Sequence, residues 1–204
     1  PNIKIFIHAD SKMTDNLNEL NYDNTIIVPN DKRVNVIWSQ ISIVEATLTL
    51  IKTAQEYDDF DYFWLCSGQD FPIVNSNYIV DFLEKNPNKN YINFYNSKEF
   101  GLGRNNNYDK RNQIVYPKWL LNPKKYFKVL KRIYVELTGG YNHTFKMMRR
   151  KDSPCEHFYF GSAWWCLNKE TINWIMDYNK KNPEYFKFFE TCSCSDESFF
   201  HTIV

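Results

Sequence analysis

The sequence predicts an α/β protein, a sheet flanked by helices. Short apolar runs of strand length alternate with stretches whose apolar residues have helical spacing. The 204 residues, 43% of them hydrophobic, are enough to bury one substantial core. Only 6 glycines and 8 prolines are present, which is few for a chain of tight hairpins or disordered linkers. Because no internal repeat or compositional boundary divides the chain, we expect a single domain over residues 1–204.

Two short strands are expected near the start of the chain. Isoleucines alternate with other residues over positions 3–7, before a polar break. The carboxyl end of this strand brings His8 and Asp10 to a loop, and His8 itself is expected to be a satisfied histidine of the core or the sheet face. Residues 25–28 form the second strand.

A helix and a central strand follow. Apolar residues at positions 41, 44, 48 and 51 have the spacing of an amphipathic helix, with Ser39 placed to cap it. The apolar run 62–66 is typical of a strand covered on both faces. Glycine and proline in residues 67–73 then end the strand and expose polar side chains.

The second half continues the alternation of strands and helices. We expect a helix with Ile79, Phe82 and Leu83 on one face, a strand over 91–95 and a long loop over 98–111. Four further elements end the chain: a helix that begins at Pro123 and closes at Gly139-Gly140, a strand over 163–167, a helix capped by Asn168, and a last helix that begins near Ser195.

Charge and hydropathy exclude two classes of protein. Twenty-five basic residues against twenty-four acidic residues leave a net charge of +1, which gives no overall field for nucleic acid or for an anionic membrane, although local charged patches stay open. The apolar runs are also far shorter than the roughly 20 residues that a membrane-spanning helix needs. Six tryptophans, fourteen tyrosines and sixteen phenylalanines are the unusual feature. We expect most of these rings in the core, although aromatic rings also stack on sugars and bases.

The five cysteines indicate a reducing compartment. They form no C-x-x-C pair and no spacing typical of zinc, and an odd number cannot all pair within one chain. The chain opens without the apolar segment of a secretory signal. We therefore expect a cytoplasmic protein, with peripheral association with a membrane as an option.

Asp10 is a candidate ligand-binding residue. It follows the first predicted strand, and ligands of open α/β sheets bind beyond the carboxyl ends of strands. Its carboxylate could accept hydrogen bonds from a uracil or a ribose. The alternative is that Asp10 only begins a turn.

Asp70 is a second candidate, in the loop after the central strand. A divalent metal in this place is often held by an Asp-x-Asp motif, but Ser67, Gly68 and Gln69 precede a single aspartate. The oxygen ligands of a metal site are therefore incomplete. The alternative is that Asp70 and Pro72 shape the turn.

Asp196 and Glu197 place two acids at a helix start. The helix dipole favours negative charge there, which is a sufficient structural explanation. Successive helical residues point about 100° apart, so we expect only one of the two to face a cleft. A carboxylate in a cleft could take the proton of an attacking hydroxyl as a general base.

Five blocks of sequence, in order and with matching spacing, resemble the core-2/I-branching N-acetylglucosaminyltransferase and peptide O-xylosyltransferase family. The resemblance covers roughly residues 3–204. The blocks are Ile7–Lys12, Val36–Trp38 with the following Ser42 to Ala46, Ser67–Ile73, Gly161–Trp165 and Asp196–Thr202.

The resemblance implies a GT-A-type, Rossmann-like fold with a mixed central sheet flanked by helices, and an inverting enzyme. Such an enzyme transfers a sugar from a UDP-sugar to a hydroxyl of a glycan or glycoprotein, without an obligatory metal or other cofactor. The missing second aspartate near Asp70 agrees with this. N-acetylglucosamine is the first expectation for the donor sugar and xylose the second.

The resemblance also assigns residues. Glu197 matches the general base of the branching enzymes, and Asp10 and Trp38 match contacts to uridine, although a core position for Trp38 stays open. The expected sugar site is lined by Ser67, Gly68, Gln69, Asp70, Gly161, Ser162 and Trp164.

Two departures from the family concern the acceptor and the base. The acceptor-binding glutamate of the family falls at Asn93, and Arg104 and Arg111 are expected to contact the acceptor instead. The xylosyltransferases use an aspartate in an earlier loop as base, for which Asp109 and Asp152 are counterparts.

A third departure concerns the diphosphate. The basic residues that neutralise it in the family lie beyond Val204, so either the loop residues Arg104, Lys110, Arg111, Arg149 and Arg150 replace them or the chain is a piece of a longer enzyme. We favour a piece, in the Golgi lumen if the protein is eukaryotic. The alternative function is an inactive glycan- or nucleotide-binding domain of the same fold.

Overall fold

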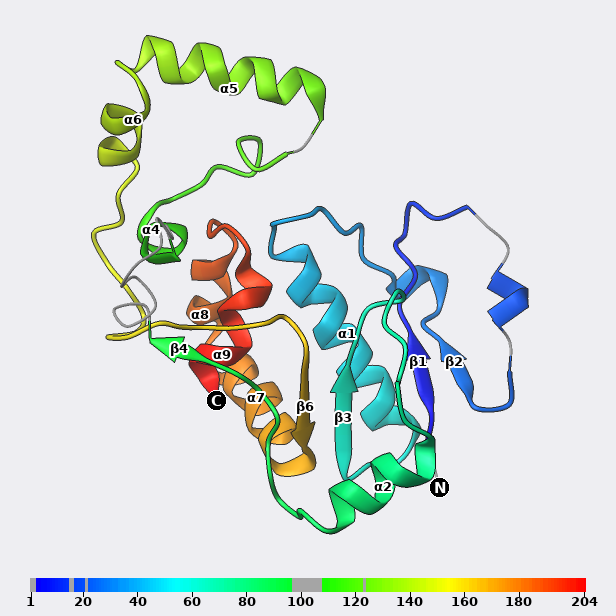
Figure 1. Ribbon diagram of the computed structural model, residues 1–204. Coiled ribbons are helices and arrows are strands. Elements are labelled where there is room, and N and C mark those ends of the chain that lie inside the picture. The colour runs from blue at the N-terminus through cyan, green and yellow to red at the C-terminus, as the bar shows by residue number, and fades with distance from the viewer. Residues whose placement is uncertain (1–2, 15–16, 21, 97–107, 123) are drawn as a thin grey trace.

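The computed structural model describes residues 3–14, 17–20, 22–96, 108–122 and 124–204, and it is a mixed α/β structure, as predicted (Figure 1). The strands are β1 (Ile5–Ile7), β2 (Thr25–Ile27), β3 (Tyr62–Leu65), β4 (Tyr95–Asn96), β5 (Tyr159–Phe160) and β6 (Trp165–Asn168). The α-helices are α1 (Ser42–Tyr57), α2 (Ser76–Glu84), α4 (Tyr108–Gln113), α5 (Lys125–Leu137), α6 (Tyr141–Met147), α7 (Lys169–Lys181), α8 (Pro183–Phe189) and α9 (Phe199–Ile203). Short 3-10 turns are η1 (Leu17–Leu20), η2 (Asn30–Lys32) and η3 (Ser195–Glu197).

The strands pair in both directions, as expected of a mixed sheet, but not as one continuous sheet within the described residues. β1 pairs with β2 in parallel, whereas β3 pairs with β6 and β4 pairs with β5 in antiparallel order. Only a single bridge, between Tyr91 and Cys166, extends the β3–β6 unit. The predicted strand 91–95 is therefore reduced to this bridge and the start of β4.

Helix α1 forms where the apolar spacing predicted it, but the predicted cap is wrong. Ser39 has a φ of 68°, in the left-handed region, so it cannot take the extended conformation of an N-cap. Its hydroxyl instead lies 2.9 Å from the hydroxyl of Ser193. The hydroxyl of Ser42 accepts a hydrogen bond from the backbone N–H of Ile37 at 2.8 Å and fixes the entry to the helix.

The core lies between β6, helix α1 and the helices of the C-terminal third, and it confirms that many of the aromatic residues are structural. Tyr185, Phe189, Phe199 and Phe200 are almost fully buried. The centroid of the Tyr185 ring lies 5.0 Å from that of Phe189 and 5.1 Å from that of Phe199. The Tyr185 hydroxyl donates a hydrogen bond of 2.7 Å to the carbonyl of Phe199, so this buried polar group is satisfied.

Helix α7 begins as predicted, because the Asn168 side chain accepts a hydrogen bond of 2.8 Å from the backbone N–H of Thr171. The prediction that the central strand is covered on both faces is wrong, since Trp64 on β3 is exposed. Residues 108–111 belong to α4 instead of a long loop, and the rest of that predicted loop, 98–107, lies outside the described residues. Within the described ranges, every helix is too short or too polar to cross a membrane.

Candidate functional site

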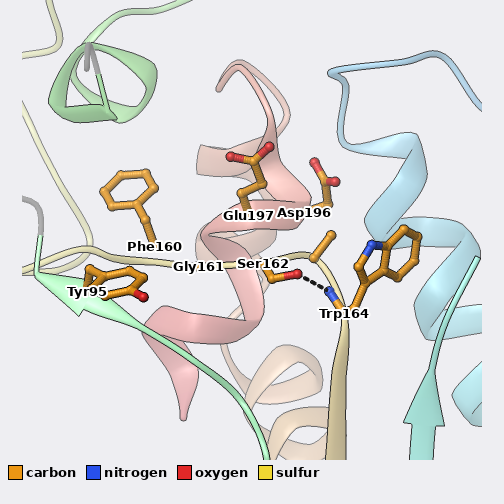
Figure 2. Close-up of a pocket in the computed structure, with 8 residues that line it drawn as sticks. Tyr95, Phe160, Gly161, Ser162, Trp164, Asp196 and Glu197 are labelled. Carbon is orange, nitrogen blue, oxygen red and sulfur yellow. Dashed lines mark hydrogen bonds between the residues drawn. The ribbon is translucent and has the colours of Figure 1, made fainter. Parts of the chain in front are cut away.

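A cavity of about 440 Å³ lies where the segment between β5 and β6 meets η3 (Figure 2). Four residues predicted from sequence are brought together here, although two separate parts of the chain supply them: Gly161, Ser162, Trp164 and Glu197. The other lining residues are Tyr95, Phe160, Ala163 and Asp196.

Gly161 holds the two walls of the cavity together. Its backbone N–H donates a hydrogen bond of 3.0 Å to the carbonyl of Glu197. A Cβ atom at this position would collide with the carbonyl oxygen of Asn93 and would lie 2.7 Å from the imidazole of His201. Only glycine allows this close approach of backbone to backbone, so the residue type follows from the packing.

Ser162 and Asn93 shape the adjacent part of the wall. The side-chain oxygen of Asn93 accepts a hydrogen bond of 3.1 Å from the backbone N–H of Ser162. The Ser162 hydroxyl in turn accepts one of 3.3 Å from the N–H of Trp164, which Figure 2 shows as a dashed line. The Trp164 side chain remains half exposed at the cavity. Asn93, which the sequence predicted at the acceptor site, does not line the cavity; its hydrogen bond positions the lining segment Gly161–Trp164.

Both acids of η3 line the cavity, so the prediction that only one faces a cleft is wrong. The reason is local: residues 195–197 form a 3-10 turn preceded by Cys194 with a φ of 53°, so the angular spacing of an α-helix does not apply. The Glu197 carboxylate forms an ion pair with the guanidinium of Arg111 from α4. Both side chains keep about a third of their surface exposed, 27% for Arg111 and 31% for Glu197.

The two acids differ in their titration. Burial, together with the neighbouring negative charge of Glu197, raises the pKa of Asp196 to about 6, against the opposing effect of backbone hydrogen bonds and Arg111. Asp196 is therefore ionised at neutral pH and becomes protonated in mild acid.

His201 lies behind the lining segment and was not predicted from the sequence as a site residue. It is only 2% exposed, and burial lowers its pKa to about 4, partly offset by the nearby Ser162 backbone. Neither ring nitrogen has a partner with hydrogen-bond geometry among the described residues. The neutral ring packs against Gly161. His201 belongs to the sequence block Asp196–Thr202 that resembles the family, and this was the signal that could have identified it as a site residue. Tyr95 and Phe160 lie outside the five sequence blocks, so no sequence signal marked them as site residues.

Asp10 and Trp38, predicted to contact uridine, do not line this cavity. The Asp10 carboxylate accepts hydrogen bonds from the Lys12 backbone N–H at 2.9 Å and pairs with its ammonium at 3.1 Å. Partial burial opposes ionisation, but these contacts outweigh it and lower the pKa of Asp10. Trp38 is 73% exposed, so the alternative of a core position is wrong. His8 is a satisfied histidine as predicted, since it accepts a hydrogen bond of 2.9 Å from the Val34 N–H.

The loop after β3 is an exposed turn held by its own residues. An Asp70 carboxylate oxygen accepts a hydrogen bond of 2.6 Å from the Ser67 N–H, and the Ser67 hydroxyl accepts one of 3.1 Å from the N–H of Gln69. These contacts agree with the alternative that Asp70 shapes the turn, and Gly68 has open space around it. In the ranges that the structure describes, no three His, Cys, Asp or Glu side chains gather as a metal would require.

The remaining predicted cations and acids lie elsewhere. Arg150 donates hydrogen bonds to the Phe188 carbonyl at 3.1 Å and to the Thr191 hydroxyl at 2.5 Å, and it stacks 4.0 Å from the Phe188 ring centre. It is therefore a structural residue. Arg149 and Asp152 are exposed outside the cavity lining. Arg104 and the side chains of Asp109 and Lys110 lie outside the described residues.

Comparison with known proteins places the chain in a family. A xylosyltransferase from Ciona intestinalis is 25% identical to the chain over 206 residues. The match covers 98% of this chain but 21% of that protein, so the chain spans about a fifth of the length of this relative. The profile of the Core-2/I-Branching enzyme family matches residues 4–204, which include every lining residue of the cavity. The chain therefore belongs to the Core-2/I-Branching enzyme family.

Proposed function

We propose that this chain carries the acceptor-activating part of an inverting glycosyltransferase with a GT-A-type fold. In this proposal the enzyme moves a sugar from a UDP-sugar to a hydroxyl of a glycan or glycoprotein and needs no metal. The observation that carries the proposal is the position of Glu197. Its carboxylate lines a 440 Å³ cavity together with the glycine-containing segment Gly161–Trp164.

Glu197 acts as the general base. Its carboxylate takes the proton of the acceptor hydroxyl while that oxygen forms a bond to the anomeric carbon of the donor. The bond between this carbon and the UDP oxygen breaks, and UDP leaves with the electron pair. Because the nucleophile attacks from the face opposite to UDP, the configuration of the sugar is inverted.

Arg111 is a positioning residue for this step. Its guanidinium pairs with Glu197 and so fixes the carboxylate at the cavity wall. The acceptor hydroxyl must come within hydrogen-bond reach of the same carboxylate. In this proposal Arg111 therefore lies beside the acceptor.

The nucleotide is held by a different part of the chain. Asp10 follows β1, and the turn Ser67–Asp70 follows β3, so both lie at the carboxyl ends of strands. The exposed ring of Trp38 is free to stack on uracil. This arrangement agrees with the rule that ligands of α/β sheets bind beyond the carboxyl ends of the strands.

One observation favours the second candidate, an inactive glycan- or nucleotide-binding domain. None of the described residues that line the cavity is a lysine or an arginine. A departing UDP carries negative charge that must be stabilised when no metal does so. A site without such a cation would bind ligand without turning it over.

One assay separates the two candidates. UDP binding and UDP-sugar hydrolysis by the purified chain would be measured with and without EDTA, with UDP-xylose beside UDP-GlcNAc because the Ciona intestinalis relative is a xylosyltransferase. UDP-galactose and UDP-glucose serve as controls for donor choice. The transferase predicts slow hydrolysis of one donor that EDTA does not change. Binding without any hydrolysis would select the inactive domain, and hydrolysis abolished by EDTA would contradict the metal-independent mechanism.

A further inference from the structure

Helix α5, Lys125–Leu137, presents an apolar stripe to solvent. Its exposed apolar residues recur three or four positions apart, so they share one face of the helix. At about 100° per residue this stripe covers roughly 100° of the helix circumference. The side chains are between 47% and 83% exposed. They are Tyr126, Val129, Leu130, Ile133 and Leu137.

A different face of α5 already has its partners in the fold. Val135 is buried, and the Tyr134 ring packs edge-on against Trp119 with 5.4 Å between centroids. Helix α5 ends at two glycines with φ near +90°, Gly139 and Gly140, which turn the chain into α6. The stripe is thus not the face by which α5 is attached to the rest of the protein. Figure 1 shows α5 at one end of the molecule, apart from the strands.

The charge of α5 is strongly positive. The helix carries four basic residues and a single acidic one, Glu136. Within the described parts of the chain none of these charges takes part in an ion pair. By helical geometry Lys125, Lys128 and Arg132 flank the apolar stripe on one side, about 40° to 100° beyond its edge at Val129, and Glu136 lies between them and that edge.

Helix α2, Ser76–Glu84, shows that exposed aromatic residues alone do not give this pattern. Helix α2 has no buried residue, and Tyr78 is well exposed. Its charged residues are Asp81 and Glu84, and it has no lysine or arginine. Both helices expose apolar surface, but only α5 joins that surface to positive charge.

We propose that α5 docks this chain on an anionic membrane surface. An interfacial helix lies flat, with its apolar stripe at the boundary between head groups and acyl chains and its basic side chains on anionic head groups. The exposed stripe with three basic side chains on one flank fits that surface. This surface is separate from the Glu197 cavity, so the inference does not rest on the proposed catalytic function.

The test is co-sedimentation of the purified chain with vesicles. One set contains phosphatidylcholine and phosphatidylserine, and the other contains phosphatidylcholine alone. We expect binding to the first set only, weakened by added salt because the electrostatic part is screened. The double variant Leu130→Gln/Ile133→Gln and the triple variant Lys125→Gln/Lys128→Gln/Arg132→Gln should each lower the bound fraction about tenfold.

A matched control separates α5 from exposed apolar surface in general. The double variant Ile73→Gln/Tyr78→Gln removes two exposed apolar side chains in and before α2 and should bind vesicles as the unchanged chain does. Far-UV circular dichroism checks that each variant folds. Failure of the unchanged chain to bind anionic vesicles, or equal binding by the α5 variants, would overturn the proposal. So would a dimer that depends on Leu130 and Ile133 without vesicle binding, since a second copy would then cover the stripe.

Discussion

The two sides of the proposed active site are built in different ways. The wall that carries Glu197 is fixed by contacts between distant parts of the chain, from Asn93 to Ser162 and from Gly161 to Glu197. The proposed nucleotide side, with Trp38 and the Ser67–Asp70 turn, is exposed and held by neighbours in sequence. A catalytic group needs a fixed position, whereas a surface loop can change without loss of the fold. The difference predicts that substitutions on the wall affect stability and those on the loops affect binding.

The largest difference between the two sides is expected for glycine-to-alanine substitutions. Gly161→Ala introduces a Cβ that collides with the Asn93 carbonyl, so we expect a loss of about 3 kcal/mol or more in the free energy of unfolding. Gly68→Ala, in open space on the loop, should change it by less than about 0.5 kcal/mol. Urea denaturation of both variants measures the difference, and equal stability would show that the wall is not tightly packed.

His201 gives the wall a sensitivity to acid. Its pKa is lowered to about 4 in the fold, from 6.5 in the unfolded chain, so the unfolded state binds the proton more readily. Stability from the neutral ring is present above pH 6.5 and is lost as the pH falls toward 4, by about 3 kcal/mol in total. In His201→Leu this loss should disappear. Unfolding curves of both proteins at pH 7 and about pH 4.5 measure this loss of stability. The same pH dependence in the variant would show that His201 is not its source.

Asp196 has the opposite dependence on pH. Its pKa is raised to about 6 from 3.8, so the folded state favours the protonated acid, and the ionised form at neutral pH is unfavourable. Asp196→Asn should therefore stabilise the chain at pH 7.5 by on the order of 2 kcal/mol, with the gain vanishing below about pH 4. Thermal unfolding at several pH values measures it. A gain that does not vary with pH would assign the effect to something other than the charge.

The smallest effect on stability is expected at Trp38. Because the ring is exposed, Trp38→Ala should change the free energy of unfolding by less than about 0.5 kcal/mol. Loss of stacking on uracil should weaken UDP binding about tenfold. Titration calorimetry with UDP measures the dissociation constant, and Trp174→Ala, which removes another half-exposed tryptophan, is the control. Equal UDP affinity of both variants would remove Trp38 from the nucleotide site.

Local sequence patterns predicted the elements better than the contacts between them. The spacing of apolar residues located α1 and α5, and the Asn168 cap located the start of α7, because such signals depend on near neighbours. The sheet was less predictable: Trp64 lies in a continuous apolar run, yet it is exposed. An apolar run shows that a strand is favoured, but not which of its faces is covered.

The geometry of the site was predictable only in part. The ordered blocks identified Gly161 and Glu197, which the structure places side by side. The partner of Glu197 is Arg111, 86 residues away in a helix that the sequence pattern presented as a loop. Such a pairing depends on the tertiary fold and leaves no local pattern. The same is true of His201, whose burial against Gly161 sets its titration.

The central claim is that Glu197 is the general base, and one comparison tests it most directly. Turnover of the donor that the chain hydrolyses, with its acceptor, would be measured beside UDP binding for Glu197→Gln and for the control Glu84→Gln at the end of α2. Loss of a general base predicts turnover about 10² to 10⁴-fold lower in Glu197→Gln, with UDP affinity unchanged and Glu84→Gln unaffected. Turnover in Glu197→Gln within a few-fold of the unchanged chain would contradict the account.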